Sequence, residues 1–259
     1  MEAFYECSKL ENILFEEKSN LTIINQITFY NCTELKSISI PSSFQYIYDY
    51  VFFNCTKLET ILFKEESNLK EIGIYSFYNC SKLETISIGE LSNLTNIGSY
   101  SFSNCINLAS IKLPSRLKNI SSNLFEGCSK LKSVTILSNI SNIYDFSFLN
   151  CSSLECIQYF GTEEPSISQN AFQGCTTLKY IYTNLIYLNE TFGDFEVRKT
   201  SELMCSSYLS SSERSGLKNG EIACIVIFSV IFVVIICAIL FFTVFRRKEH
   251  NNKEEENTP

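Results

Sequence analysis

Residues 69–88 read Leu-Lys-Glu-Ile-Gly-Ile-Tyr-Ser-Phe-Tyr-Asn-Cys-Ser-Lys-Leu-Glu-Thr-Ile-Ser-Ile, and the pattern in this stretch recurs through most of the chain. Phe77 lies three residues before Cys80, and Leu83 lies three residues after it. The same Phe-x-x-Cys-x-x-Leu-x-x-(Ile/Val) pattern surrounds Cys7, Cys32, Cys55, Cys80, Cys105, Cys128, Cys151 and Cys175. Successive cysteines are 23 to 25 residues apart. A period of this length predicts a stack of coils, because one such unit buries its apolar face only against its neighbours.

Each unit contains one segment with the period of a half-buried strand. After Leu83 the residues alternate between polar and apolar as far as Ile88. A second isoleucine precedes each cysteine from Cys32 onward by eight residues, as Ile72 precedes Cys80, and the length variation between units falls in the loop before it. Both the period and the strand position are typical of leucine-rich repeats. We therefore predict a curved leucine-rich-repeat solenoid with a parallel β-sheet on its concave face and an irregular or short helical convex side.

The chain divides into five segments by composition. Residues 1–183 hold the repeats, and 184–198 are expected to form a C-terminal cap, which solenoids need. Residues 199–221 are rich in serine and indicate a stalk. Residues 222–245 are uncharged and apolar, long enough for a transmembrane helix. Residues 246–259 form a short charged tail.

The charges beside the apolar run predict its orientation. Arg246, Arg247 and Lys248 follow it at once, so the positive-inside rule places the tail in the cytosol and the repeats outside. We expect a single-pass plasma-membrane protein. No basic and apolar signal peptide is visible at the N-terminus, which begins in the middle of a repeat. That start is expected of a chain whose N-terminal part lies upstream of Met1. The alternative is a membrane-anchored scaffold inserted after synthesis, with its repeats in the cytosol.

The composition disfavours several classes of function. The formal net charge is −7, which argues against a nucleic-acid partner. The chain has one histidine, His250 in the tail, so histidine-dependent catalysis and histidine-ligated zinc are excluded from the repeats. We expect no enzyme activity, no cofactor and no metal.

The cysteines first suggest a disulfide scaffold, since there are twelve. However, eight of them occupy the same inward position of the repeat, where a free thiol behaves as a small apolar side chain. We therefore expect unpaired buried thiols at these eight positions. The four cysteines outside the register are Cys156, Cys205, Cys224 and Cys237.

The outward strand positions are the candidate binding surface, because curved repeat walls suit protein or glycan partners. The charged candidates are Lys36, Glu59, Glu84, Lys132 and Lys179. Tyr159, Tyr180 and Tyr182 are the aromatic candidates near the last repeat, because aromatic residues are enriched in interfaces. Candidate N-glycosylation sites are Asn20, Asn93, Asn119, Asn139 and Asn189. The sequons at Asn31, Asn54, Asn79 and Asn150 immediately precede a repeat cysteine, where we expect asparagine to serve the turn.

The units closely resemble the BspA-like, Treponema-type leucine-rich-repeat proteins from about Phe4 to Thr183. Further hallmarks of that family are Ile40-Pro41, Leu113-Pro114, Ile72-Gly73, Ile97-Gly98, Ala3-Phe4 and Ala171-Phe172. The resemblance implies a surface antigen similar to those of parasitic protists. It also implies recognition or adhesion, with a protein or glycan ligand on a host cell or matrix.

Overall fold

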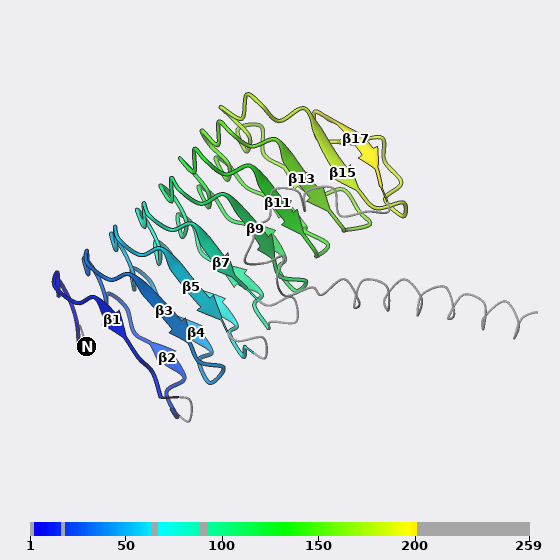
Figure 1. Cartoon of the computed structure of the whole chain (residues 1–259). Coiled ribbons are helices and arrows are strands. Elements are labelled where there is room, and N and C mark those ends of the chain that lie inside the picture. Colours follow the sequence, from blue (N-terminus) through cyan, green and yellow to red (C-terminus); the bar gives the residue numbers. More distant parts are fainter. Residues whose placement is uncertain (1–2, 17–18, 64–66, 89–92, 201–259) are drawn as a thin grey trace, which may run out of the picture. The chain divides into compact units, whose positions relative to one another are not determined.

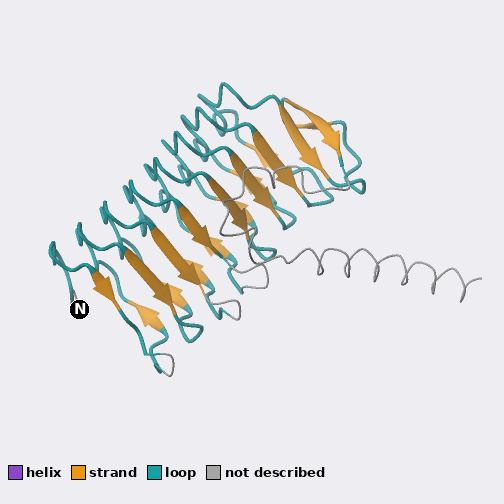
Figure 2. Ribbon diagram, viewed as in Figure 1, coloured by secondary structure: helices purple, strands orange, loops and turns teal. Residues whose placement is uncertain are grey.

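The computed structural model describes residues 3–16, 19–63, 67–88 and 93–200, which form a solenoid of stacked coils (Figure 1). Each coil contributes a strand to one wall, which has four residues in most coils, and every coil but the last contributes a two-residue strand to the opposite wall (Figure 2). The long-strand wall consists of β1 (Asn12–Ile13), β3 (Ser37–Ile40), β5 (Thr60–Phe63), β7 (Thr85–Ser87), β9 (Ser110–Leu113), β11 (Ser133–Ile136), β13 (Cys156–Tyr159) and β15 (Tyr180–Thr183). The short-strand wall consists of β2 (Ile23–Ile24), β4 (Tyr46–Ile47), β6 (Glu71–Ile72), β8 (Asn96–Ile97), β10 (Asn119–Ile120), β12 (Asn142–Ile143) and β14 (Ser166–Ile167).

Neighbouring strands pair in parallel, one repeat apart. Ile38 of β3 faces Ile61 of β5, and Ile61 faces Ile86 of β7. The pairing divides each wall into two sheets: β1-β3-β5-β7 is separate from the sheet that begins at β9, and β2-β4-β6-β8 is separate from β10-β12-β14. Both interruptions fall at the same place along the stack.

The predicted solenoid with a parallel sheet is confirmed. On the side opposite the long strands, where the sequence predicts irregular or short helical segments, the structure has two-residue strands joined by irregular segments. The described residues contain strands, turns and irregular segments but no helix (Figure 2). Within them, no helix has the length and apolar character needed to cross a membrane. The apolar run 222–245, the stalk beyond Thr200 and the tail lie outside the described residues.

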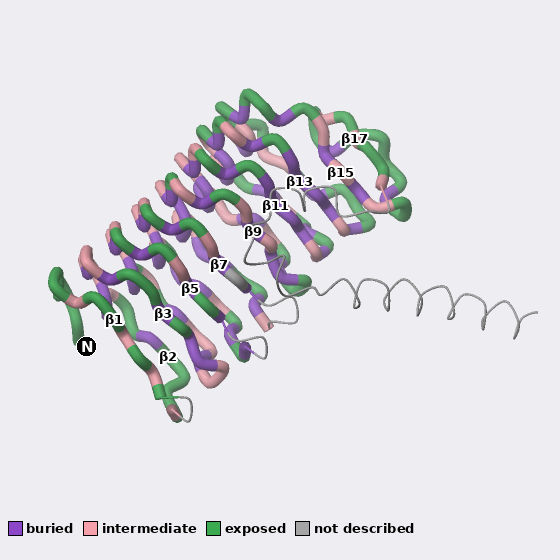
Figure 3. The backbone as a smooth tube through the Cα atoms, in the orientation of Figure 1, coloured by how far each residue is buried: buried purple, intermediate pink, exposed green. Residues whose placement is uncertain are grey.

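Buried residues recur from coil to coil along the stack (Figure 3). Their side chains form one continuous hydrophobic core. Phe29, Cys32, Leu35 and Ile38 are buried, as are their equivalents in the following coils except Phe172, which is half-buried. The phenylalanine rings stack from Phe4 to Phe172 with centroids 5.1 to 5.8 Å apart. This spacing is close to the ~4.8 Å between paired strands, so each coil adds one ring to the column.

The repeat cysteines are free thiols. Seven of them are buried, and each of these donates a weak hydrogen bond from Sγ to the backbone oxygen of the phenylalanine in the preceding coil, at 3.1 to 3.3 Å. Cys55 bonds to Phe29 and Cys80 to Phe52 in this way. The expectation of unpaired thiols is confirmed at these positions, and the thiol also links one coil to the next.

The residue before each cysteine adopts a left-handed backbone conformation. Asn54 has φ 58°, and Gly127 has φ 72° at the same position of its repeat. Asparagine and glycine tolerate this conformation best. The Asn54 amide Nδ2 donates to Asn31 Oδ1 at 2.7 Å, and the Asn79 Nδ2 donates to Asn54 Oδ1 at 2.7 Å. The predicted turn role of these asparagines is therefore confirmed, and their side chains form a ladder along the stack.

A hairpin lies at the C-terminal end of the described repeats, within the range where the sequence predicts a cap. β17 (Phe195–Lys199) pairs in parallel with β15, and β16 (Thr191–Phe192) pairs antiparallel with β17. The Phe195 ring meets the last ring of the column, Phe172, edge-on at 5.2 Å. Phe192 is fully buried, so this end of the core is covered by apolar side chains.

Candidate interaction surface

The charged candidates lie on the long-strand wall with their side chains in solvent. Each directly precedes a strand, and each is exposed: Lys36, Glu59, Glu84, Lys132 and Lys179. They form one column along the stack because the parallel strands are in register. The column has mixed charge, which suits a partner with a matching polar pattern.

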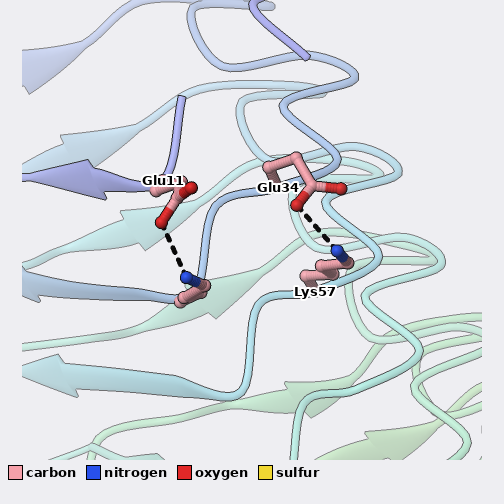
Figure 4. Close-up of polar contacts among 4 residues, drawn as sticks. Glu11, Glu34 and Lys57 are labelled. Atoms are coloured by element: carbon pink, nitrogen blue, oxygen red, sulfur yellow. Dashed lines mark hydrogen bonds and ion pairs between the residues drawn. The ribbon is translucent and has the colours of Figure 1, made fainter. Parts of the chain in front are cut away.

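Ion pairs link neighbouring coils at this column and beside it (Figure 4). Lys36 Nζ lies 2.7 Å from Glu11 Oε2, and Lys57 Nζ lies 2.7 Å from Glu34 Oε2. The hydrogen bond from Lys36 lowers the pKa of the Glu11 carboxyl, and the same bond raises the pKa of Lys36. Both pairs are exposed, so they organise the surface more than they stabilise the fold.

The wall is not equally open along its length. In β3 and β5 the outward side chains are exposed or half-buried, including Ser39 and Leu62. In β11 and β13 the outward positions are buried as well: Ser133, Thr135, Cys156 and Gln158. The accessible strand surface therefore includes β1, β3, β5, β9 and β15, and Thr85 of β7 is half-buried.

The structure corrects the place of Tyr159. This residue lies in register with Ile136 on the inward side of the wall, and it is fully buried. Its hydroxyl donates to the Glu163 backbone oxygen at 2.7 Å, and its ring packs edge-on against Phe192 at 5.1 Å. Tyr159 is a core residue under the C-terminal hairpin, so it cannot contact a partner on the wall.

Tyr180 and Tyr182 are half-buried on β15, as expected of outward positions. The Arg198 guanidinium lies 3.4 Å from the centroid of the Tyr180 ring, and Arg198 is the strand neighbour of Tyr182. The stacked cation holds the ring in place. Sequence reasoning missed Arg198, since only the pairing of β17 with β15 brings it to this surface.

The candidate glycosylation sites differ in accessibility. Asn20, Asn139 and Asn189 are exposed, whereas Asn93 and Asn119 are half-buried. The Asn139 side-chain oxygen accepts a hydrogen bond from the Thr162 backbone amide at 2.7 Å, and the Asn189 Nδ2 donates to Glu164 Oε2 at 2.9 Å. In the turn ladder, Asn54 and Asn79 likewise use Nδ2, the atom that would carry a glycan, to bind the asparagine of the preceding coil.

Cys156 is the exception among the described cysteines. It is disulfide-bonded, whereas the eight repeat cysteines are free, so its partner is none of those eight.

The described residues contain no group of three or more histidine, cysteine, aspartate or glutamate side chains placed to hold a metal ion.

Known proteins with the same repeat place the chain in a family. The model of the BspA type leucine rich repeat region matches in six copies, over residues 1–93 and 70–193. The crystal structure of the T. pallidum leucine rich repeat protein is similar, with 32% identity and a TM-score of 0.55, over 61% of this chain and 72% of that one. The pneumococcal vaccine antigen PcpA shares the fold, with 23% identity and a TM-score of 0.57, over 68% of this chain and 44% of that one.

A search of curated proteins finds no match. The family model nevertheless covers most of the chain and all the repeats seen in the structure. Leucine-rich-repeat solenoids of this kind are typically non-enzymatic scaffolds for interaction with other proteins. The chain belongs to the BspA-type leucine-rich-repeat family.

Proposed function

We propose that this chain is a cell-surface recognition or adhesion protein, which binds a protein or glycan of a host cell or matrix through the open part of its long-strand wall. The observation that carries the proposal is the difference between the inward and the outward positions of the repeat. The inward positions are nearly constant and buried, whereas the outward positions vary from coil to coil and remain accessible over β3, β5, β9 and β15. Variable positions on a rigid scaffold are where repeat proteins place their binding surface.

Two kinds of side chain on this wall suit recognition. The exposed column supplies both charges, with Lys36 and Glu59 on adjacent coils. Tyr180 and Tyr182 supply aromatic surface. Arg198 stacks on the Tyr180 ring and restricts its movement in the free protein. Pre-ordered aromatic and arginine side chains are favoured in binding hot spots because little conformational entropy is lost on association.

The proposed location is the plasma membrane, with the repeats outside and the C-terminus in the cytosol. The apolar run 222–245 and the basic residues after it support this orientation. The disulfide at Cys156 also supports it, since structural disulfides persist in oxidising compartments. The alternative is a membrane-anchored scaffold with cytosolic repeats, which the eight free thiols would suit.

Binding to host cells or matrix tests the function. In the full chain, Lys36, Lys132 and Lys179 are changed together to glutamate, and the matched control carries the same change at Lys9, Lys82 and Lys118, which are exposed outside the long strands. Binding should fall at least about tenfold in the wall variant and stay within about twofold of wild type in the control. Equal loss in both variants would show an effect of net charge alone and would overturn the role of the wall.

Protease and glycosidase treatment of intact cells decides the location. Repeats that face outward are cleaved by added protease and shift in mass after glycosidase treatment. Repeats that resist both on intact cells, but not after permeabilisation, would leave the cytosolic scaffold as the correct function.

A further inference from the structure

A second surface lies on the edge of the solenoid, in the turns that lead from the short-strand wall to the long-strand wall. Seven aromatic side chains form two stacked rows there, and we call them the aromatic plate: Tyr5, Tyr30, Phe53 and Tyr78 in one row, and Tyr50, Tyr75 and Tyr100 in the other. Ring centroids within the rows are 4.5 to 5.2 Å apart, with planes within 16° of parallel. The rows also touch each other, since Tyr75 meets Tyr78 edge-on at 5.4 Å.

The plate lies outside the core. Its members are half-buried or exposed, with 37% of Tyr50 accessible. Tyr48 and Ile74, beside it in the same turns, are 37% and 43% exposed. The phenylalanine column already connects the coils in the interior, so the plate is an additional apolar surface in contact with solvent.

The backbone under the second row disfavours large side chains. Tyr50, Tyr75 and Tyr100 have φ of 57°, 54° and 60°, in the left-handed region, where a bulky side chain is uncommon. The equivalent position holds Ile27, Asn123 and Phe146 in other coils, with φ of 51°, 56° and 58°. The left-handed turn is therefore common to these coils, and three successive coils place a tyrosine in it, so that the rings stack as a row.

The plate is confined to the N-terminal coils. Its first row ends at Tyr78, because the equivalent positions in later coils hold Ser103, Glu126, Leu149 and Gln173. The later coils fold without these aromatic side chains, so a requirement of the repeat fold does not explain why the plate is present only in the N-terminal coils.

Two carboxylates border the plate: Asp49 directly precedes Tyr50, and the charge of Glu126 acts on the Tyr75 phenol. Segments 25–31, 48–54, 73–79, 98–104 and 121–127 contain no lysine or arginine. Basic residues begin two positions after the cysteines, at Lys9, Lys57, Lys82 and Lys130, and Lys57 is paired with Glu34. An aromatic surface beside carboxylates is complementary to a cationic partner.

We propose that the aromatic plate is a docking surface for an arginine- and lysine-rich polypeptide segment. Phenol oxygens and the neighbouring carboxylates accept hydrogen bonds from guanidinium and ammonium groups, while the ring edges cover their aliphatic stems. A sugar ring is a poorer fit, because the faces of the inner rings are covered by one another. A second copy of the chain is also a poorer fit, since its net charge is −7. This surface is separate from the long-strand wall and does not depend on the function proposed for it.

The test uses the full chain in detergent and a fluorescein-labelled peptide of alternating arginine and lysine, about twelve residues long, at ~0.15 M salt to screen distant charges. Anisotropy should show saturable binding that weakens at least about tenfold in Y50N/Y75N/Y100N, which keeps the charge and copies the residue of the Asn123 coil. The matched control is F146N, because Phe146 has the same turn position (φ 58°) outside the plate. The control and Y180S/Y182S should bind within about twofold of wild type.

A variant that leaves every ring in place protects the test against misfolding. D49N/E126Q removes two carboxylates, and the amide oxygen introduced at position 49 can still accept the hydrogen bond that the Ile74 backbone amide donates to Asp49 at 2.7 Å. It should weaken peptide binding several-fold. The proposal is overturned if wild type does not bind the peptide, if both variants bind it as wild type does, or if a neutral oligosaccharide binds the plate and the peptide does not.

Discussion

The Cys55 thiol donates to the backbone oxygen of Phe29 at 3.2 Å, across the boundary between two coils. That oxygen also accepts the backbone amide of Cys32 at 3.2 Å, within its own turn. The phenylalanine carbonyl is therefore shared between a local turn and the next repeat, and the cysteine supplies the second donor. This pairing explains why the cysteine keeps a fixed distance from the phenylalanine in every unit.

Burial of the repeat thiols predicts selective labelling. Burial raises the pKa of Cys32 to about 11 and that of Cys128 to about 12, so little reactive thiolate forms at pH 8. Cys7 is exposed. Iodoacetamide should modify Cys7 within minutes in the native protein and the buried thiols from Cys32 to Cys151 only after unfolding, as measured by peptide mass spectrometry. Native labelling of Cys105 at the rate of Cys7 would contradict the buried ladder.

The same shifts predict a loss of stability in alkali. A thiol whose pKa is higher in the folded chain than in the unfolded chain stabilises the fold fully below the unfolded value of about 9. That contribution is lost as pH rises from about 9 toward 12, because the unfolded thiols ionise first. Urea unfolding at pH 8 and pH 10.5 should show lower stability at the higher pH. The C128A variant has one such thiol fewer, so its free energy of unfolding should fall less between pH 8 and pH 10.5 than that of wild type.

Removing one ring from the phenylalanine column should lower the free energy of unfolding strongly in the middle of the column and only slightly at its N-terminal end. F102A leaves a cavity between Phe77 and Phe125, and we expect it to lower the free energy of unfolding by ~3–5 kcal/mol. Phe4 is 44% exposed, so F4A should cost less than half as much. Denaturant titration of both variants checks this, and equal losses would show that the column is not the core.

The asparagine ladder separates a backbone effect from a hydrogen-bond effect. N54A loses both side-chain hydrogen bonds and leaves alanine at φ 58°, at a cost of ~2–3 kcal/mol. N54G loses the same bonds but suits the backbone, so it should be about 1 kcal/mol more stable than N54A. The control N107A removes a half-buried asparagine that accepts a hydrogen bond from Lys130 and lies outside the ladder, and it should change stability by less than about 0.5 kcal/mol. Identical stabilities for N54A and N54G would contradict the left-handed role.

If the repeats are outside the cell, the ladder also predicts which sequons carry glycans. Asn20 and Asn139 are exposed and should be occupied. Asn54 and Asn79 should remain unmodified, because a glycan on Nδ2 would displace the bond to the preceding coil. Glycopeptide mapping of protein from its own cells checks both statements, and a glycan on Asn79 would contradict the second.

The inward positions could be predicted from the sequence because they repeat. Phe52, Cys55, Leu58 and Ile61 are all fully buried, and the asparagine before the cysteine has the turn conformation expected of it. Tyr159 is misplaced when it is grouped with the outward tyrosines by residue type. Its alternation with Gln158 and its equivalence to Ile136 place it in the core.

The aromatic plate could not be predicted in this way. Residues two and five positions before a cysteine share one edge only because the backbone between the walls turns through left-handed residues at fixed places. Arg198 reaches Tyr180 only through the pairing of β17 with β15. Both features depend on how turns and strands meet across coils, which the spacing of apolar residues does not encode.

The interruption between β7 and β9, repeated between β8 and β10, affects how the stack resists a pulling force. Within the described ranges, the strand ladders stop on both walls at this boundary. The coils are held there by the contact of Phe102 with Phe125, by the bond from Cys128 to Phe102, and by turn amides such as that of Phe102 to Leu124. Side-chain hydrogen bonds from Arg116 to Asn93 and from Ser121 to the Ile97 backbone oxygen add to these contacts. A tension applied along the stack is therefore carried at this point by side chains and turn amides rather than by strand ladders. The array should yield there first and separate into two halves, each of which keeps its own ladders.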